Sequence, residues 1–312
     1  LNSHNICMFF DIWHITMFGP IEFILAGVLV GFCVGITGVG GGSLMTPILI
    51  SLFRIEPHIA IGTDLLYAAI SKFCGSMVHA KKMNIVWPIV IWLAVGSIPA
   101  SLGTHWVLEN YLSQSTSYKA VLTTVLGFML TLTGVSIVFR GHIERFFNKF
   151  RKNETLDMTQ DLEKVNFSAK DKRAYIVIMG IVLGVFVTLS SVGAGAFGIM
   201  ALVLMFPNLP MIRIIGSDVV HAVLLTLVAG LGHMSSGNVD LHLLGWLLVG
   251  SIPAIVVGTL ISSRLPEKII RKILGITLFA LGINFILHPV KVKPVEKPTT
   301  AMILTVEKSN NG

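Results

Sequence analysis

The chain has 312 residues, of which 54% are hydrophobic and only 12% are charged. A soluble domain carries about 25% charged residues, so this chain has too little charge to cover a water-facing surface. Together with a mean hydropathy of +0.81, the composition indicates an integral membrane protein and excludes soluble enzymes and soluble binding domains.

The net charge of +7 does not indicate a nucleic-acid partner, because the basic residues are not spread over one face. Nine of the 23 Lys and Arg residues fall in the single stretch 140–173, and most of the others flank apolar runs. This placement is typical of the loops that set membrane topology. The three cysteines have no metal-binding spacing, so we expect neither a metal nor another cofactor.

Apolar runs of about 20 residues, the length that crosses a bilayer, recur along the chain. In chain order we expect an interfacial segment at 1–19, a first membrane repeat at 20–139, a charged cytoplasmic loop at 140–173, a second membrane repeat at 174–288 and a polar tail at 289–312. The predicted spans are a broken segment over 20–52, single spans at 57–79, 85–107 and 120–139, a second broken segment over 174–206, and single spans at 212–233, 241–262 and 269–287. The predicted fold is therefore all-α and polytopic, with about 8–10 membrane segments.

The two halves of the chain resemble each other, which makes the chain a tandem duplication. Such internal similarity is typical of transporters built from two structural repeats. At an offset of 153 or 154 residues, the matching segments are 37–42 with 190–195, 61–64 with 215–218, and 96–100 with 250–254, the last pair sharing Gly-Ser-Ile-Pro-Ala.

The relative orientation of the halves depends on their glycine-rich breaks, at 38–42 and 193–195. If each broken segment is a hairpin of two short helices, each half crosses the membrane five times, and an odd number inverts the second half. The distribution of Lys and Arg barely separates inverted from parallel repeats. We expect inversion, because a glycine break at membrane depth is tolerated only where it lines a cavity, and paired inverted broken helices build one.

Each glycine break can bring backbone N–H groups close to a ligand, because glycine has no Cβ. Where the next helix begins, at Ser43 or Ala196, unpaired amides and the positive end of the helix dipole favour an anion. The alternative is that the glycines only permit tight helix packing. The predicted substrate-binding residues around the two breaks are Thr37, Gly38, Gly40, Gly41, Gly42, Ser43, Ser190, Ser191, Gly193 and Gly195.

Three ionisable residues, Asp64, Lys72 and Asp218, lie inside apolar segments, where a charge is costly and indicates function. Lys72 would attract a negatively charged substrate, and only Thr226 aligns with it in the second half. The alternatives are that Lys72 extends to the membrane surface and that the two carboxylates stabilise helix starts. The predicted coupling or gating groups here are Asp64 and Asp218 with their neighbours Thr63 and Ser217.

His79 and His233 occupy equivalent positions in the two halves, and imidazoles can carry protons near neutral pH. They are therefore further candidates for coupling or gating, with hydrogen bonding to a neighbouring loop as the alternative. The chain has no His-Glu-x-x-His, Gly-x-Ser-x-Gly, Walker or Cys-x-x-Cys motif, so we do not expect an enzyme.

Several motifs together give the chain a family resemblance. They are Gly38-Val-Gly-Gly-Gly-Ser-Leu-Met-Thr-Pro47, Ile61-Gly-Thr63, His79 with Asn84, and the run from His233 to Asp240, His-Met-Ser-Ser-Gly-Asn-Val-Asp. From about Phe23 to Leu287 the chain resembles the sulfite exporter TauE/SafE family, also described as the toluene-sulfonate uptake permease class. The resemblance implies two homologous modules in a bacterial cytoplasmic (inner) membrane and transport of small sulfur-containing or organic anions.

The resulting hypothesis is a secondary transporter that works by alternating access around a mid-membrane site formed by the two breaks. Its partners would be a small anionic substrate, membrane lipid and protons or Na⁺ as coupling ion, and a homo-oligomer is compatible with it. A rival is a non-transporting scaffold or receptor that docks through 140–173. A second rival, an intramembrane enzyme, needs His79 and His233 to converge, which inverted repeats oppose.

Overall fold

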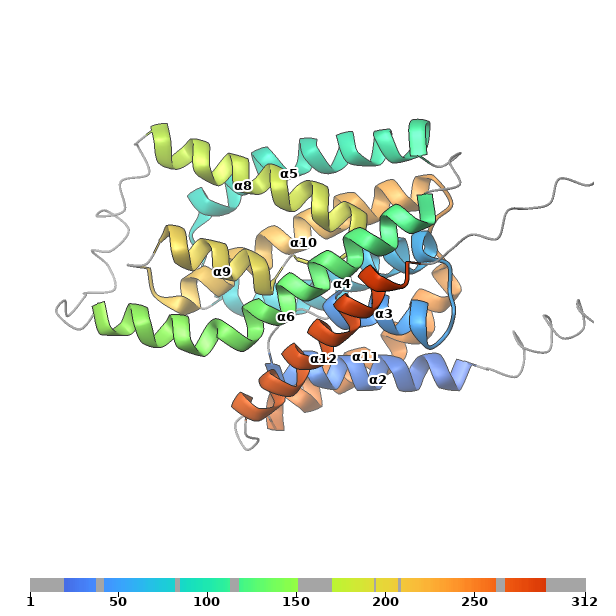
Figure 1. Cartoon of the computed structure of the whole chain (residues 1–312). Coiled ribbons are helices and arrows are strands. Elements are labelled where there is room, and N and C mark those ends of the chain that lie inside the picture. The colour runs from blue at the N-terminus through green and yellow to red at the C-terminus, as the bar shows by residue number, and fades with distance from the viewer. Residues whose placement is uncertain are drawn as a thin grey trace, which may run out of the picture.

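The structure is a computed structural model that describes residues 20–37, 42–81, 85–112, 118–150, 170–193, 195–206, 209–261 and 267–289. Within these residues the chain forms ten α-helices, one short π-helical turn and no β-strand (Figure 1). The predicted all-α class is therefore confirmed. The elements are α2 (Pro20–Thr37), α3 (Gly42–Ser51), α4 (Pro57–Lys81), α5 (Trp87–Val107), η1 (Leu108–Leu112), α6 (Tyr118–Phe150), α8 (Lys170–Ser190), α9 (Ala196–Met205), α10 (Met211–Ser235), α11 (Leu241–Ile261) and α12 (Glu267–Leu287).

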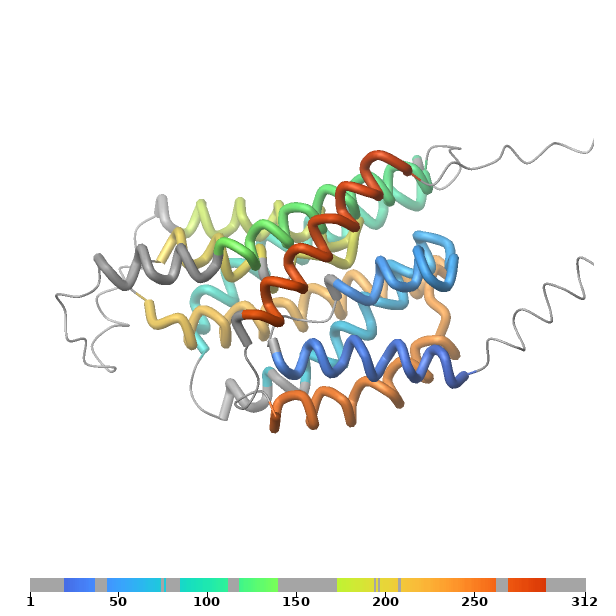
Figure 2. The backbone as a smooth tube through the Cα atoms, turned by 60° about the horizontal axis from the view of Figure 1, so that its bottom comes forward, coloured from blue at the N-terminus to red at the C-terminus, as the bar shows by residue number. Residues whose placement is uncertain are grey.

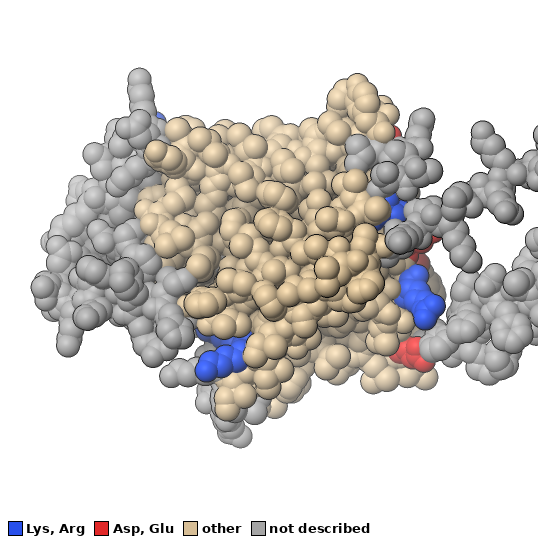
Figure 3. All heavy atoms as spheres, viewed as in Figure 1, with Lys and Arg blue, Asp and Glu red and all other residues tan. Residues whose placement is uncertain are grey.

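Six of the described helices, α5, α6, α8, α10, α11 and α12, are long and apolar enough to cross a membrane. Large apolar side chains such as Leu25, Ile91 and Leu260 are exposed on the outside of the bundle. On the face shown in Figure 3, the described charged residues lie towards the two ends and leave the middle uncharged. The protein is therefore an integral, multi-pass membrane protein, as its composition predicts.

The observed helices follow the predicted spans closely, and α8 and α9 are separated at the predicted glycine break. The charged stretch 140–173 differs from its prediction as a loop, because α6 continues to Phe150 and α8 begins at Lys170. Arg, Glu and Lys favour helix, so a helix can continue past the end of an apolar run. The predicted interfacial segment 1–19, the middle of the loop at 151–169 and the tail from 290 lie outside the described residues.

The first helix of each half packs against the fourth helix of the other half. Helix α2 packs on α11, and α8 packs on α5, as neighbouring ribbons in Figures 1 and 2. On α2, glycines 27, 31 and 35 meet the backbone of α11 at residues 247, 251 and 255, so these helices run parallel. On α8, glycines 180 and 184 meet α5 at residues 93 and 97 in the same way. Small residues let the backbones approach closely, as is common in membrane bundles.

The third and fifth helices of each half pack against their own equivalents. In the α4–α10 pair, Gly62 lies against Asn238 and Leu66 lies against Gly230, so the helices are antiparallel. The α6–α12 pair is antiparallel too, because residue 127 meets residue 282 and residue 134 meets residue 275. The two halves thus interlock, and α4 and α10 cross in the middle of the bundle (Figure 1).

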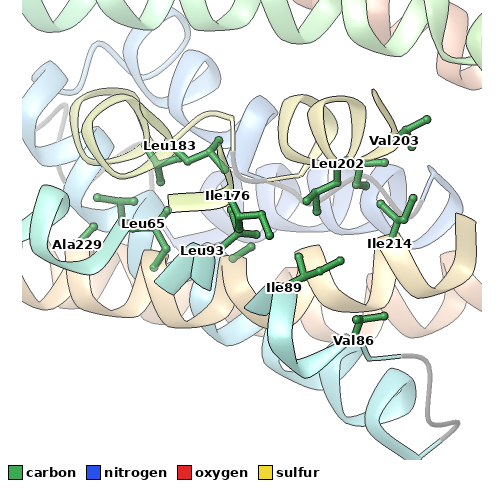
Figure 4. Close-up of a cluster of buried hydrophobic side chains, with 14 of the residues drawn as sticks. Leu65, Val86, Ile89, Leu93, Ile176, Leu183, Leu202, Val203, Ile214 and Ala229 are labelled. Carbon is green, nitrogen blue, oxygen red and sulfur yellow. The ribbon is translucent and has the colours of Figure 1, made fainter. Parts of the chain in front are cut away.

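Buried apolar side chains form two clusters, and α4 contributes to both. Figure 4 shows the first cluster, where Leu65 of α4, Leu93 of α5 and Leu202 of α9 lie near one another. The second cluster joins α2, α3, α6, α11 and α12 around Leu66 and Tyr67 of α4. The helix that carries Asp64 and Lys72 is therefore enclosed on both sides.

Candidate substrate and coupling site

The break between α8 and α9 has a backbone that few side chains tolerate. Ser191 has a φ of 58°, Gly193 a φ of 115° and Gly195 a φ of 146°, and the last two conformations favour glycine. The Ser190 hydroxyl lies 2.6 Å from the Phe186 carbonyl oxygen and accepts a hydrogen bond from the Val192 N–H at 3.2 Å. Ser190 therefore holds the break in shape.

Asp64 joins the two halves of the molecule at this break. Its carboxyl group is fully buried, and its Oδ2 accepts hydrogen bonds from the N–H of Thr46, at 3.2 Å, and from the Thr46 hydroxyl. The hydroxyl of Ser191 lies beside the same carboxyl group. One carboxylate of the first half thus contacts α3 of its own half and the break of the other half.

Asp218, the equivalent of Asp64, lies against the start of α9. It is 1% exposed, and a Cβ at Gly198 would clash with its Oδ1. A side chain at the third residue of α9 would therefore displace this carboxylate. Each predicted gating carboxylate lies beside the short helix that follows the break of its own half.

Lys72 is buried within electrostatic range of both carboxylates. It is 7% exposed and interacts electrostatically with Asp218 and, more weakly, with Asp64. The aligned Thr226 instead donates a hydrogen bond to the Ala222 carbonyl oxygen of its own helix at 2.7 Å. A single buried cation therefore interacts with both of the aligned carboxylates.

Thr63 and Ser217, the other two predicted gating residues on these helices, tie the two halves together. The Thr63 hydroxyl accepts a hydrogen bond from the Asp240 N–H at 3.1 Å, and the Ser217 hydroxyl accepts one from the Val86 N–H at 2.8 Å. Residues 63 and 217 differ by 154, and so do residues 86 and 240. The two hydrogen bonds therefore join equivalent positions in the two halves.

Sequence reasoning missed a second pair of polar contacts between the two halves. The Ser97 hydroxyl lies 2.8 Å from Nε2 of His221, which is buried. In the equivalent contact with the roles of the halves exchanged, the Tyr67 hydroxyl lies beside Ser251. Both serines belong to the Gly-Ser-Ile-Pro-Ala motifs, and Tyr67 and His221 also differ by 154. Extending the offset to every polar residue would have found them, whereas Thr46, the partner of Asp64, has only Met200 at this offset.

Of the two predicted histidines, His233 is described in full. It is completely buried near the end of α10, with Nε2 3.0 Å from the Thr188 carbonyl oxygen. His79 lies near the far end of α4, and because α4 and α10 are antiparallel the two histidines do not converge. Glycines 38, 40 and 41 and the side chains of Thr37, Ser43 and His79 lie outside the described part of the chain, and Gly42 appears as the first residue of α3.

The arrangement combines anion-binding donors with a buried charge cluster. Thr46 donates to Asp64, the Ser191 hydroxyl lies beside the same carboxyl group, and Lys72 adds a positive charge. Each of these residues and Asp218 is at most 7% exposed, so this conformation keeps the charge cluster away from solvent on both sides. A buried carboxylate in a membrane protein is suited to carrying a proton, and a buried cation is suited to holding an anion.

Comparison with known proteins places the chain among membrane transporters. The family model for the sulfite exporter TauE/SafE matches residues 23–285. The probable membrane transporter protein YjnA of Bacillus subtilis is 35% identical over 266 residues, covering 85% of this chain and 99% of YjnA. A second one, YdhB of Bacillus subtilis, is 26% identical over 264 residues, covering 83% and 97%. A third, MJ0441 of Methanocaldococcus jannaschii, is 23% identical over 257 residues, covering 79% and 86%. No solved structure matches the chain significantly.

Proposed function

We propose that this chain, which belongs to the sulfite exporter TauE/SafE family of membrane transporters, moves small sulfur-containing or organic anions by secondary transport. Sulfite, sulfonates and sulfoacetate-like compounds are the substrates that the family name and the site chemistry favour. The observation that carries the proposal is the buried cluster of Asp64, Lys72 and Asp218, in which the lysine interacts electrostatically with both carboxylates. A charge cluster at this depth is costly and is kept where a protein moves ions or protons.

The contacts of Asp64 suggest how substrate and proton are linked. An ionised Asp64 occupies the donors of Thr46 near the start of α3. Protonation of Asp64 removes that negative charge and frees the N–H and hydroxyl of Thr46 for a substrate oxyanion, next to the hydroxyl of Ser191. Lys72 then supplies the compensating charge, so anion and proton cross together. In this scheme the other coupling ion considered, Na⁺, has no role.

Alternating access requires two conformations that expose the site to opposite sides in turn. The antiparallel packing of α4 on α10 and of α6 on α12 supports inverted repeats, because a two-fold axis in the membrane plane reverses each helix relative to its equivalent. The exchange of partners between α2–α11 and α8–α5 supports the same symmetry. In our proposal the two breaks move apart on one side while they close on the other.

Uptake by purified protein in proteoliposomes tests this function. A panel of labelled sulfite, methanesulfonate, sulfoacetate and acetate separates sulfur oxyanions from carboxylates, and protein-free liposomes are the control. We expect saturable uptake of at least one sulfur oxyanion, accelerated by an inwardly directed proton gradient. Absence of saturable flux for every anion of the panel would contradict the proposal.

The rival function, docking of a partner through the charged connection, predicts a different result. Because α6 ends at Phe150 and α8 begins at Lys170, residues 151–169 can be replaced by a Gly/Ser linker of equal length without cutting a helix. A transporter keeps its flux after this replacement. If the linker variant keeps its flux in liposomes but loses its function in cells, the docking function would be favoured instead.

A further inference from the structure

A groove lies on the outside of the bundle, at the end where α2 and α11 begin and α3 ends. Its volume is about 1230 Å³, whereas pockets for small ligands measure about 300–1,000 Å³. Lys119 at the start of α6 bonds to Glu56 near this end, and α6 runs from there to Phe150. The groove, called the α2 groove below, therefore lies at the end opposite the 151–169 connection.

The lining of the α2 groove changes from charged to apolar along its length. Glu22, Arg54 and Asp240 line it near the end of the bundle, at the start of α2, after α3 and before α11. Leu25 and Leu29 line it further along α2 and are 59% and 60% exposed. Leu29 follows Glu22 by seven residues, or about 10 Å along the helix axis. A charged end above an exposed apolar stretch is complementary to a membrane lipid, which has the same order of groups.

The second half contains an equivalent pocket without the charges. It measures about 410 Å³ and is lined by Tyr175, Ile178, Met179, Met205 and Phe206. At the offset of 153 residues these positions correspond to 22, 25, 26, 52 and 53, and all five line the α2 groove. Because α8 begins after the 151–169 connection, this second pocket lies at the connection end of the bundle. The chain thus repeats the pocket, and only the α2 groove adds charged groups to it.

Arg54 has a backbone conformation that usually requires glycine. Its φ is 53°, in the left-handed region that strains other residues. Its side chain is exposed, and among the described residues neither Arg54 nor Glu22 forms an ion pair. Strain of this kind is typical of positions where the side chain has a function. The guanidinium at the groove is therefore available to a ligand.

The charges of the α2 groove favour one class of headgroup. Beside the imidazole of His242, the lining holds two carboxylates and one guanidinium. Oδ1 of Asp240 accepts the N–H groups of His242 and Leu243 at 2.9 Å, which fixes this carboxylate at the start of α11. A phosphate pairs with a guanidinium, and an ammonium donates to a carboxylate. The excess of carboxylates opposes a headgroup with a net negative charge.

We propose that the α2 groove binds one phospholipid with a primary ammonium headgroup, of the phosphatidylethanolamine class, in the leaflet away from the 151–169 connection. Arg54 binds its phosphate, Glu22 accepts hydrogen bonds from its ammonium group, and an acyl chain lies along Leu25 and Leu29. The lipid also contacts α3, because Ile48 of the lining lies two residues after Thr46, the partner of Asp64. The proposal does not depend on the transported substrate.

Native mass spectrometry of the purified full-length protein tests the site. Detergent micelles are titrated with phosphatidylethanolamine, its N,N-dimethyl form, phosphatidylcholine and phosphatidylglycerol, all with the same acyl chains. We expect the first phosphatidylethanolamine to bind about tenfold more tightly than phosphatidylcholine or phosphatidylglycerol. The dimethyl lipid should lie in between, because it keeps the positive charge but has only one N–H. Equal affinities for all four lipids, or no retained lipid because another part of the chain fills the groove, would overturn the site.

Headgroup variants locate the binding. Glu22→Gln should reduce the preference for phosphatidylethanolamine over phosphatidylcholine to less than about twofold, whereas Tyr175→Phe at the equivalent position should preserve it. Arg54→Gln should weaken both lipids about tenfold, because both carry a phosphate. Arg173→Gln makes the same change of charge near the start of α8 and should have no effect on this preference. Unchanged binding in both Glu22→Gln and Arg54→Gln would overturn the proposal.

Two further variants test the acyl chain and the backbone. Leu25→Trp fills the groove and should weaken phosphatidylethanolamine about tenfold, whereas Ile178→Trp at the equivalent position should keep the headgroup preference. Arg54→Gly removes the guanidinium but suits a φ of 53°, so it should melt no earlier than the unchanged protein and bind lipid as weakly as Arg54→Gln. Full binding by Arg54→Gly would contradict a role for the guanidinium.

Discussion

The surroundings of Asp64 and Asp218 show where the two halves of this duplicated chain agree and where they differ. Both carboxylates are buried beside the short helix of their own half. Asp64, however, bonds to Thr46 and has Lys72 on its own helix, whereas Asp218 lies against Gly198 with Thr226 at the equivalent helix position. The two carboxylates therefore differ in the charged and hydrogen-bonding groups that surround them.

The contacts that hold the bundle together show no such difference. The bonds of Thr63 to Asp240 and of Ser217 to Val86 repeat at an offset of 154 residues. The parallel glycine-lined helix pairs repeat too, with an offset of 153 residues between their glycines and of 154 between the partners. The framework contacts are therefore repeated in the two halves, whereas the polar groups at the centre are not. In a transporter, we expect the framework residues to act equally in both halves and the central residues to act unequally.

The largest difference in anion flux between equivalent positions of the two halves should come from Lys72→Met. Removing one partner of a buried charge cluster costs about 3–5 kcal/mol, because the remaining charges lose their compensation. We expect anion flux in proteoliposomes to fall about a hundredfold or more, while Lys72→Arg restores part of it. Thr226→Val at the aligned position should leave the flux nearly unchanged, because its hydroxyl bonds only within its own helix. Equal losses at both positions would contradict functional asymmetry.

Gly31→Ala and Gly184→Ala test the symmetry of the framework. A Cβ at Gly31 would lie 2.5 Å from the Ser251 carbonyl oxygen. A Cβ at Gly184 would clash with the Ser97 carbonyl oxygen in the same way. We expect each change to lower the free energy of unfolding by about 1–3 kcal/mol, by a similar amount in the two halves. Thermal melts in detergent measure this, with Gly245→Ala as the control, since a Cβ there meets nothing within 4 Å.

A smaller effect on stability should come from Thr63→Val and Ser217→Ala, which test the framework in each half. Each removes the acceptor of one backbone N–H that joins the two halves. A lost hydrogen bond to a buried group costs about 1–2 kcal/mol, so both variants should melt earlier, and Thr63→Val should have the smaller effect because Asp240 is exposed. A large loss of flux from only one of them, at unchanged stability, would show that this residue acts in gating rather than in the framework.

The smallest effect should come from Glu56, at the surface. The hydrogen bond from Lys119 lowers the pKa of the Glu56 carboxyl group. Because the folded pKa is the lower one, the stabilisation is present above the unfolded pKa and is lost as pH falls through the folded value. The pair is half-exposed, so we expect less than about 1 kcal/mol. Glu56→Gln should remove that part of the pH dependence of the melting temperature between pH about 6 and about 3.5.

Most of the fold could be predicted from the sequence, because the bilayer imposes simple rules on it. Apolar runs of fixed length predict the helices, and the repeated segments identify equivalent ones. The end of α6 at Phe150 could not be predicted in this way, since the hydropathy of a run marks where the membrane ends and a helix can continue beyond it. The break after Ser190 was found because glycines interrupt an overlong apolar segment.

The site could be predicted only in part. Asp64, Lys72 and Asp218 stand out because charges are rare in apolar segments. Their partners do not, because Thr46, Ser97 and His221 acquire their meaning only when helices from different parts of the chain pack together. The α2 groove joins Glu22, Arg54 and Asp240 from three separate parts of the chain, which no local pattern reveals.

Proton movement during anion transport tests the central claim about Asp64 most directly. Proteoliposomes with a pH dye inside, given methanesulfonate outside, should acidify internally at the rate at which the anion enters. Asp64→Asn should stop this acidification while retaining exchange of labelled for unlabelled anion, because the amide cannot release a proton yet leaves Lys72 and the Thr46 donors in place. Proton movement that continues unchanged in Asp64→Asn would contradict the account.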